Sequence, residues 1–113
     1  MDTARMVERY VKAILRSREA LECADPKTRN RQYRIIFDCL RQLDTIGQRH
    51  EALVELLTHE SPDVRGTAIA HLIKTGHDKA VPVLEKVAEG KGAAGFDAMM
   101  VLKLWRCGEL HTL

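Results

Sequence analysis

The sequence contains five histidines, the side chains best suited to bind a transition metal. They are His50, His59, His71, His77 and His111. A zinc-protease helix needs a second histidine three positions after a His-Glu pair, and the chain has none there after His59-Glu60. His71 and His77 are six residues apart with a predicted helix end between them, so they do not share a helix face at ligand spacing. We therefore predict no metal site and treat the histidines as surface or half-buried side chains.

The residue types needed for nucleophilic catalysis do not occur in a usable pattern. The three cysteines, Cys23, Cys39 and Cys107, are widely spaced and form no C-x-x-C motif, which favours reduced thiols over disulfides or a zinc knuckle. Cys39 lies on an apolar stripe, where packing is the usual role of a free cysteine. The chain has no G-x-S-x-G motif, and its glycines at 90, 92 and 95 match neither Rossmann nor Walker spacing. We predict neither catalytic residues nor a cofactor, and hence no enzyme.

Apolar residues recur every three or four positions through most of the chain, which is typical of amphipathic helices. The predicted helices cover residues 3–23, 29–46, 50–59, 62–75, 79–90 and 96–107. In the second of these, the apolar positions are Tyr33, Ile36, Phe37, Leu40 and Leu43, and in the last they are Met99, Leu102 and Trp105. The fold class predicted from this pattern is all-α.

Several residues mark where these helices begin and end. The residue before Pro26 is pushed out of the helical region, so residues 27–30 are predicted to be a polar connection. Ser61 followed by Pro62 is a favourable helix start, and Asp78 is predicted to cap the fifth helix. The small residues at 90–95 are predicted to form a loop.

The sequence repeats itself at intervals of 29 and 30 residues. Ile35, Cys39, Leu43 and Gly47 recur as Val64, Ala68, Leu72 and Gly76, and then as Ala94, Ala98 and Leu102. Such self-similarity is typical of stacked helical hairpins, each of which cannot bury its apolar faces alone. The small residue in mid-helix would allow a neighbouring helix to come close. We predict one domain over residues 1–113, an α-α superhelix of three helical hairpins.

The motif Pro62-Asp63-Val64-Arg65, followed by Ala68, Leu72, Gly76 and the run 80–84, resembles a HEAT repeat. The resemblance is strong at residues 52–88, moderate at 29–57 and weak at 91–107, and it implies a HEAT/armadillo-like fold in which Arg65 alone represents the arginine ladder. The segments VERYVKA, ALVELL, SPDVRGTAIAHL and GFDAMMVLKLWRCGEL make the chain similar to a small bacterial family called domain of unknown function number twenty-nineteen. This second resemblance implies an α-α superhelix and no known activity, cofactor or catalytic residue.

The composition favours a well-solvated surface, and the charge is unevenly distributed between the two halves of the chain. Charged residues make up 30% and aromatic residues 4% of the 113 positions. Residues 1–50 contain eleven Lys and Arg against seven Asp and Glu (+4), and residues 51–113 contain seven against nine (−2), in agreement with the net charge of +2. No signal peptide or run of about 20 apolar residues occurs, so we expect a cytoplasmic protein without a membrane association.

The function predicted from these features is that of a small helical scaffold that binds a protein partner, for example as an immunity or antitoxin protein that blocks another protein. The predicted contact residues occupy non-core positions of the second helices of the hairpins: Arg34, Asp38, Arg41, Thr67, His71, Lys74 and Asp97. Asp38 and Asp97 are predicted to be exposed acids on equivalent helices, without an evident partner that would raise a pKa. The alternative is a nucleic-acid-binding protein that uses its basic N-terminal half, in particular the run Lys27, Arg29, Arg31 and Arg34. A monomer and a homodimer both stay open.

Overall fold

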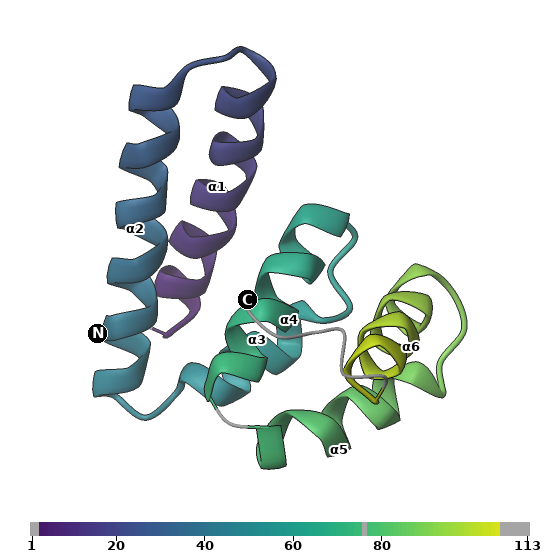
Figure 1. Cartoon of the computed structure of the whole chain (residues 1–113). Helices are drawn as coiled ribbons and strands as arrows, with labels where there is room; N and C mark the ends of the chain where they lie inside the picture. Colours follow the sequence, from purple (N-terminus) through teal and green to yellow (C-terminus); the bar gives the residue numbers. More distant parts are fainter. Residues whose placement is uncertain (1–2, 76, 107–113) are drawn as a thin grey trace. The chain divides into compact units, whose positions relative to one another are not determined.

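The computed structural model describes residues 3–75 and 77–106, without the side chains of residues 75, 77 and 78 (Figure 1). Gly76, Cys107 and His111, which entered the sequence analysis, lie outside the described residues, as does the His77 side chain. Six α-helices and no strand occupy the described part, which confirms the all-α prediction. They are α1 (Thr3–Glu22), α2 (Pro26–Thr45), α3 (Arg49–Leu56), α4 (Pro62–Thr75), α5 (His77–Ala88) and α6 (Ala93–Arg106).

The chain divides into two compact units, residues 1–52 (the N-terminal unit) and residues 53–113 (the C-terminal unit). The N-terminal unit is a hairpin in which α1 and α2 run antiparallel and side by side (Figure 1). Each helix buries one face, which on α1 consists of Met6, Tyr10, Ala13, Ile14, Ser17 and Ala20, and on α2 of Gln32, Ile36, Cys39, Leu40 and Leu43. At the open end of the hairpin, Met6 packs with Leu43 and with Ala52 of α3. The opposite face of α2 is therefore left open.

The connection between α1 and α2 is shorter than predicted. Ala24 adopts a left-handed backbone (φ 53°), and the Asp25 N–H donates to the Ala20 carbonyl (2.8 Å), which ends α1 in a Schellman arrangement. The Asp25 carboxylate then accepts from the N–H of Thr28 (3.2 Å) and from its hydroxyl (2.7 Å), with Pro26 at the first helical position. The prediction that residues 27–30 form a connection is wrong, because this cap starts α2 three residues earlier.

In the C-terminal unit, α5 packs against α6, and α4 packs against both. The small repeat residues Ala68 and Ala98 have no exposed surface, and neither does Cys39 of the N-terminal unit. These are the positions predicted to allow close helix packing, and their burial is confirmed. The Ser61 hydroxyl accepts from the Val64 N–H (3.4 Å) at the start of α4, as predicted for a helix cap.

Three predictions about the C-terminal helices are wrong. The helix α5 begins at His77, so Asp78 lies in its first turn and does not precede it. The helix α6 begins at Ala93, three residues early, and the Phe96 N–H donates to the Gly92 carbonyl (3.1 Å) in its first turn. Its buried face is Gly95, Ala98 and Leu102, whereas Met99 is 49% exposed and Trp105 is half-buried. The predicted burial of Leu102 and Ala98 is confirmed, whereas the core position predicted for Met99 is wrong. Gly95 and Ala98 face the core because small residues allow a closer approach.

Gly95 provides a test of this packing. A Cβ atom on Gly95 would overlap the Gly90 carbonyl oxygen and lie 2.9 Å from the Gly90 carbonyl carbon. The Gly90 backbone lies in the loop between α5 and α6, so it cannot make room without a shift of this loop or of α6. Gly95→Ala is therefore expected to lower the free energy of unfolding by about 1–3 kcal/mol, measured by chemical denaturation followed by circular dichroism. The matched control is Gly66→Ala in α4, whose Cβ would meet nothing within 4 Å. We expect this control to gain about 0.5–1 kcal/mol, and a Gly95→Ala variant as stable as the control would contradict the packing described.

Candidate protein-binding surface

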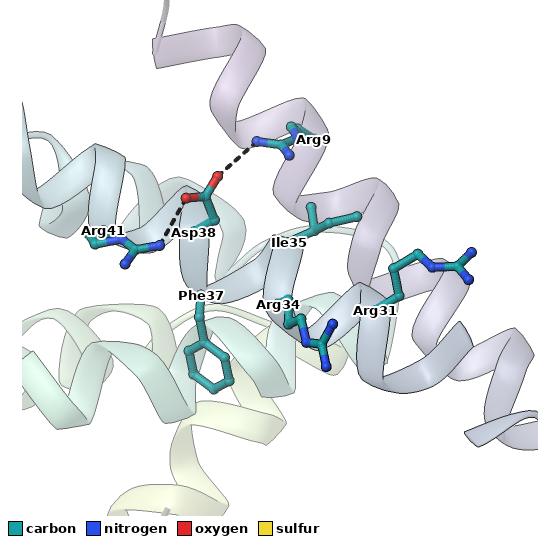
Figure 2. A pocket seen from close by; sticks show the side chains of 7 residues that line it. All are labelled: Arg9, Arg31, Arg34, Ile35, Phe37, Asp38 and Arg41. Carbon is teal, nitrogen blue, oxygen red and sulfur yellow. Dashed lines mark hydrogen bonds and ion pairs between the residues drawn. The ribbon is translucent and has the colours of Figure 1, made fainter. Parts of the chain in front are cut away.

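The open side of α2 carries a solvent-facing groove in the N-terminal unit (Figure 2). Its volume is about 560 Å³, and it is lined by Arg9 of α1 and by Arg31, Arg34, Ile35, Phe37, Asp38 and Arg41 of α2. We call it the α2 groove. Arg31, Arg34, Asp38 and Arg41 follow one another at intervals of three or four residues, so they lie along one face of the helix. This face is exposed because the opposite face of α2 is buried in the hairpin.

Asp38 lies in the α2 groove between Arg9 and Arg41 (Figure 2). Its carboxylate accepts from Arg9 of α1 (3.2 Å), from Arg41 (3.0 Å) and from the amide of Gln42 (2.9 Å). These arginine hydrogen bonds, first that of Arg41 and then that of Arg9, hold the pKa of Asp38 below its ordinary value. The prediction that Asp38 is exposed is wrong, because it is half-buried, whereas both arginines lower its pKa, in agreement with the prediction that no partner raises it. The i, i+3 spacing to Arg41 could have indicated one pair, but only the tertiary structure brings Arg9 close.

Arg31 and Arg34 differ from the other two arginines of the groove. Within residues 3–75 and 77–106, neither guanidinium forms a hydrogen bond or an ion pair, although the charge of Arg31 contributes to lowering the pKa of Asp25. The groove therefore contains four arginines and one carboxylate, an excess of three positive charges. The excess charge is concentrated at the end of the groove formed by the N-terminal half of α2.

Phe37 adds an apolar side chain to this basic groove. It is 56% exposed, and Ile35 beside it is half-buried. The prediction that Phe37 belongs to the apolar stripe of its helix is wrong, because it is exposed. The buried face of α2 follows Gln32, Ile36, Cys39 and Leu43, and Phe37 is rotated away from it by about 100° relative to Ile36.

The structure brings together three of the seven predicted contact residues, Arg34, Asp38 and Arg41, in the α2 groove. The other four belong to the C-terminal unit. There, Lys74 is exposed and the Thr67 hydroxyl donates to the Asp63 carbonyl (2.8 Å). His71 is only 8% exposed, so its assignment to a non-core position is wrong. The reason is that α4 packs against both α5 and α6 and is buried over most of its circumference, whereas α2 has one open face.

Asp97, the fourth of these residues, forms an ion pair with Arg65 that stabilises the C-terminal unit. Arg65 is 6% exposed, and its Nε donates to the Asp97 carboxylate of α6 (2.7 Å). The Arg65 Nη1 donates to the carbonyls of His59 (2.8 Å) and Glu60 (3.0 Å). One guanidinium therefore connects the loop before α4 to α6. The prediction that Asp97 is an exposed acid is wrong, because it is half-buried beside Arg65. Asp97 is the repeat equivalent of Asp38, and both positions accept from an arginine on another helix.

The buried titratable side chains have the properties of core residues. Burial raises the pKa of the Cys39 thiol, which keeps it protonated and disfavours the thiolate needed for catalysis. Burial also raises the pKa of Tyr10 far above its ordinary value. Among the described residues, no three His, Cys, Asp or Glu side chains gather in a way that could hold a metal ion. None of the described helices combines the length and the apolar character that a membrane span requires.

Comparison of the chain with models of protein families, with curated proteins and with solved structures gives no significant match. The resemblance to the family of unknown function therefore stays a prediction.

The ion pairs of Asp38 predict a measurable titration. Since its pKa in the folded chain lies below the ordinary value of 3.8, the pairing stabilises the fold above pH 3.8 and is lost as the pH falls through the lower folded pKa. Carboxyl-detected NMR titration should show this low pKa in the unchanged chain. Arg41→Gln and Arg9→Gln should each raise it toward 3.8, and an Asp38 pKa at or above 3.8 in the unchanged chain would refute the pairing.

The two repeat-equivalent aspartates should differ in their contribution to stability. Asp97→Asn is expected to lower the free energy of unfolding by about 2 kcal/mol, because the buried Arg65 guanidinium loses its only described anionic acceptor. Asp38→Asn should lower the free energy of unfolding clearly less, since the side chains of Arg9 and Arg41 are both exposed to solvent. Denaturation of both variants under the same conditions measures the difference. Equal losses would show that the burial of Arg65 does not matter.

Proposed function

We propose that this chain is a helical scaffold without catalytic activity that binds a protein partner through the α2 groove. The observation that supports it best is the combination of two arginines without ion pairs, Arg31 and Arg34, with the exposed Phe37 on one rigid helix face. Arginine and aromatic side chains are enriched where proteins bind each other, because they combine area with directed hydrogen bonds. The opposite face of α2 packs against α1 in the hairpin, so the binding surface is preformed.

Binding of a nucleic acid is less well supported by the same surface. Single strands are bound by basic grooves in which aromatic rings are open for base stacking. Among the described residues that line the groove, only Phe37 has an exposed ring. In the N-terminal half of α2, the Arg29 guanidinium lies 5.1 Å from the centre of the Tyr33 ring and donates to its hydroxyl (2.8 Å). The Asp38 carboxylate in the groove would repel a phosphate backbone. A protein surface of mixed charge fits this groove better.

Affinity capture from a lysate tests the proposal with a charge-reversed pair of variants. Arg31→Glu combined with Arg34→Glu should reduce the recovery of the partner by at least about tenfold, since each substitution replaces an attraction by a repulsion. The melting temperature should change little, because neither arginine has an ion pair to lose.

The matched control is Arg5→Glu combined with Arg16→Glu on α1, which changes the net charge equally outside the groove. This control should retain the partner. An identical set of captured proteins with both double variants would refute the use of the α2 groove. Loss of capture after nuclease treatment of the lysate would indicate that a nucleic acid, and not a protein, is bound.

A further inference from the structure

We infer that the partner occupies the α2 groove with an acidic helical segment, which places two carboxylates on Arg31 and Arg34 and an apolar side chain against Phe37. This inference rests on the proposed function, since it names the chemistry of the segment that would bind there. It is argued from the charges, the spacing and the exposure of the groove residues.

The distribution of charge within the groove selects an anionic segment and fixes where its charges must lie. Asp38 already neutralises part of the charge of Arg9 and Arg41, and it accepts three hydrogen bonds. Arg31 and Arg34 form none within the described residues, so their guanidiniums offer donors in the planar arrangement that a carboxylate accepts in pairs. The strongest attraction for carboxylates therefore lies at positions 34 and 31, one and two turns before Asp38.

The spacing of the groove residues matches a helix. Arg31 and Arg34 are three residues apart on α2, which separates their Cβ atoms by about 5–6 Å. Two acidic residues three or four positions apart on a partner helix have the same separation. The groove residues extend from position 31 to position 41, about 15 Å along the α2 axis at 1.5 Å per residue. A segment of about ten to twelve helical residues would cover this length.

Phe37 and Ile35 supply the apolar part of the contact. Phe37 lies three residues after Arg34 and is more than half exposed, so it can bury additional area against a Leu or Met one turn beyond the acidic pair. Asp38, next to Phe37, should disfavour a third acidic residue at that place. The groove thus selects a pattern of two acids followed by an apolar residue, and disfavours a uniformly anionic chain such as a nucleic acid.

The inference can be tested with a defined probe. The probe is a blocked, alanine-based helical peptide of twelve residues that carries two glutamates four positions apart and a leucine one turn further. In NMR titrations of the unchanged chain, the shifted amides should belong to residues 31–41. A control peptide with glutamine in place of both glutamates should bind at least about tenfold more weakly, because hydrogen bonds to charged groups are stronger than neutral ones.

Variants of the chain locate the contact. Arg31→Glu combined with Arg34→Glu should abolish the preference for the acidic peptide. Phe37→Ala should weaken the binding of both peptides by a similar factor, since it removes their apolar contact and leaves the arginines in place. The control Arg5→Glu combined with Arg16→Glu should leave the preference in place. Raising the salt concentration should weaken the binding of the acidic peptide and leave the binding of the glutamine peptide unchanged.

Three outcomes would overturn the inference. The first is equal binding of the acidic and glutamine peptides, and the second is shifted amides that lie outside the groove. The third is a twelve-nucleotide oligothymidylate that binds to residues 31–41 more tightly than the acidic peptide. If any of these occurs while the Arg31→Glu/Arg34→Glu chain still loses its captured protein, the proposed function stands and only the acidic nature of the segment is refuted. If the capture is unchanged as well, the proposed function fails with it.

Discussion

Close helix packing at small buried side chains is the constraint on which the rest of this structure depends. Cys39, Ala68 and Ala98 have no exposed surface, and Gly95 has no room for even a methyl group. Such positions allow helix backbones to approach and bury the leucines one turn away, Leu43, Leu72 and Leu102. Since aromatic residues are scarce, burial of aliphatic side chains contributes most of the hydrophobic stabilisation.

Arginine–aspartate pairs add a second, directional level to this packing. The equivalent positions Asp38 and Asp97 each accept from an arginine on another helix of the same unit, Arg9 in one case and Arg65 in the other. The surroundings decide what each pair does. Arg65 is buried and also binds two carbonyls of the preceding loop, so its pair fixes the path of the chain, whereas Arg9 and Arg41 stay in contact with water and shape the charge of a surface.

The α2 groove follows from the way in which the hairpin divides the surface of its second helix. One face of α2 is used for packing on α1, and the apolar and basic side chains that do not fit this face point outward together. Asp38 then separates the arginines of the groove into two that are paired and two that are available. A surface of this kind needs no conformational change to bind a partner, because the hairpin already holds its side chains in place.

The sequence by itself determined the all-α class, the six helices and the buried small residues. Helical periodicity and a 29–30-residue repeat can be recognised along the chain without knowing which helices pack together. It also identified Ser61 as a helix cap and Arg34 and Arg41 as surface cations. Only the tertiary structure decided that Phe37 and Met99 face outward, that His71 is buried and that both aspartates are paired. The rotation of a helix about its axis and the proximity of residues about 30 positions apart depend on which neighbouring helix comes closest, and that is a property of the packed chain.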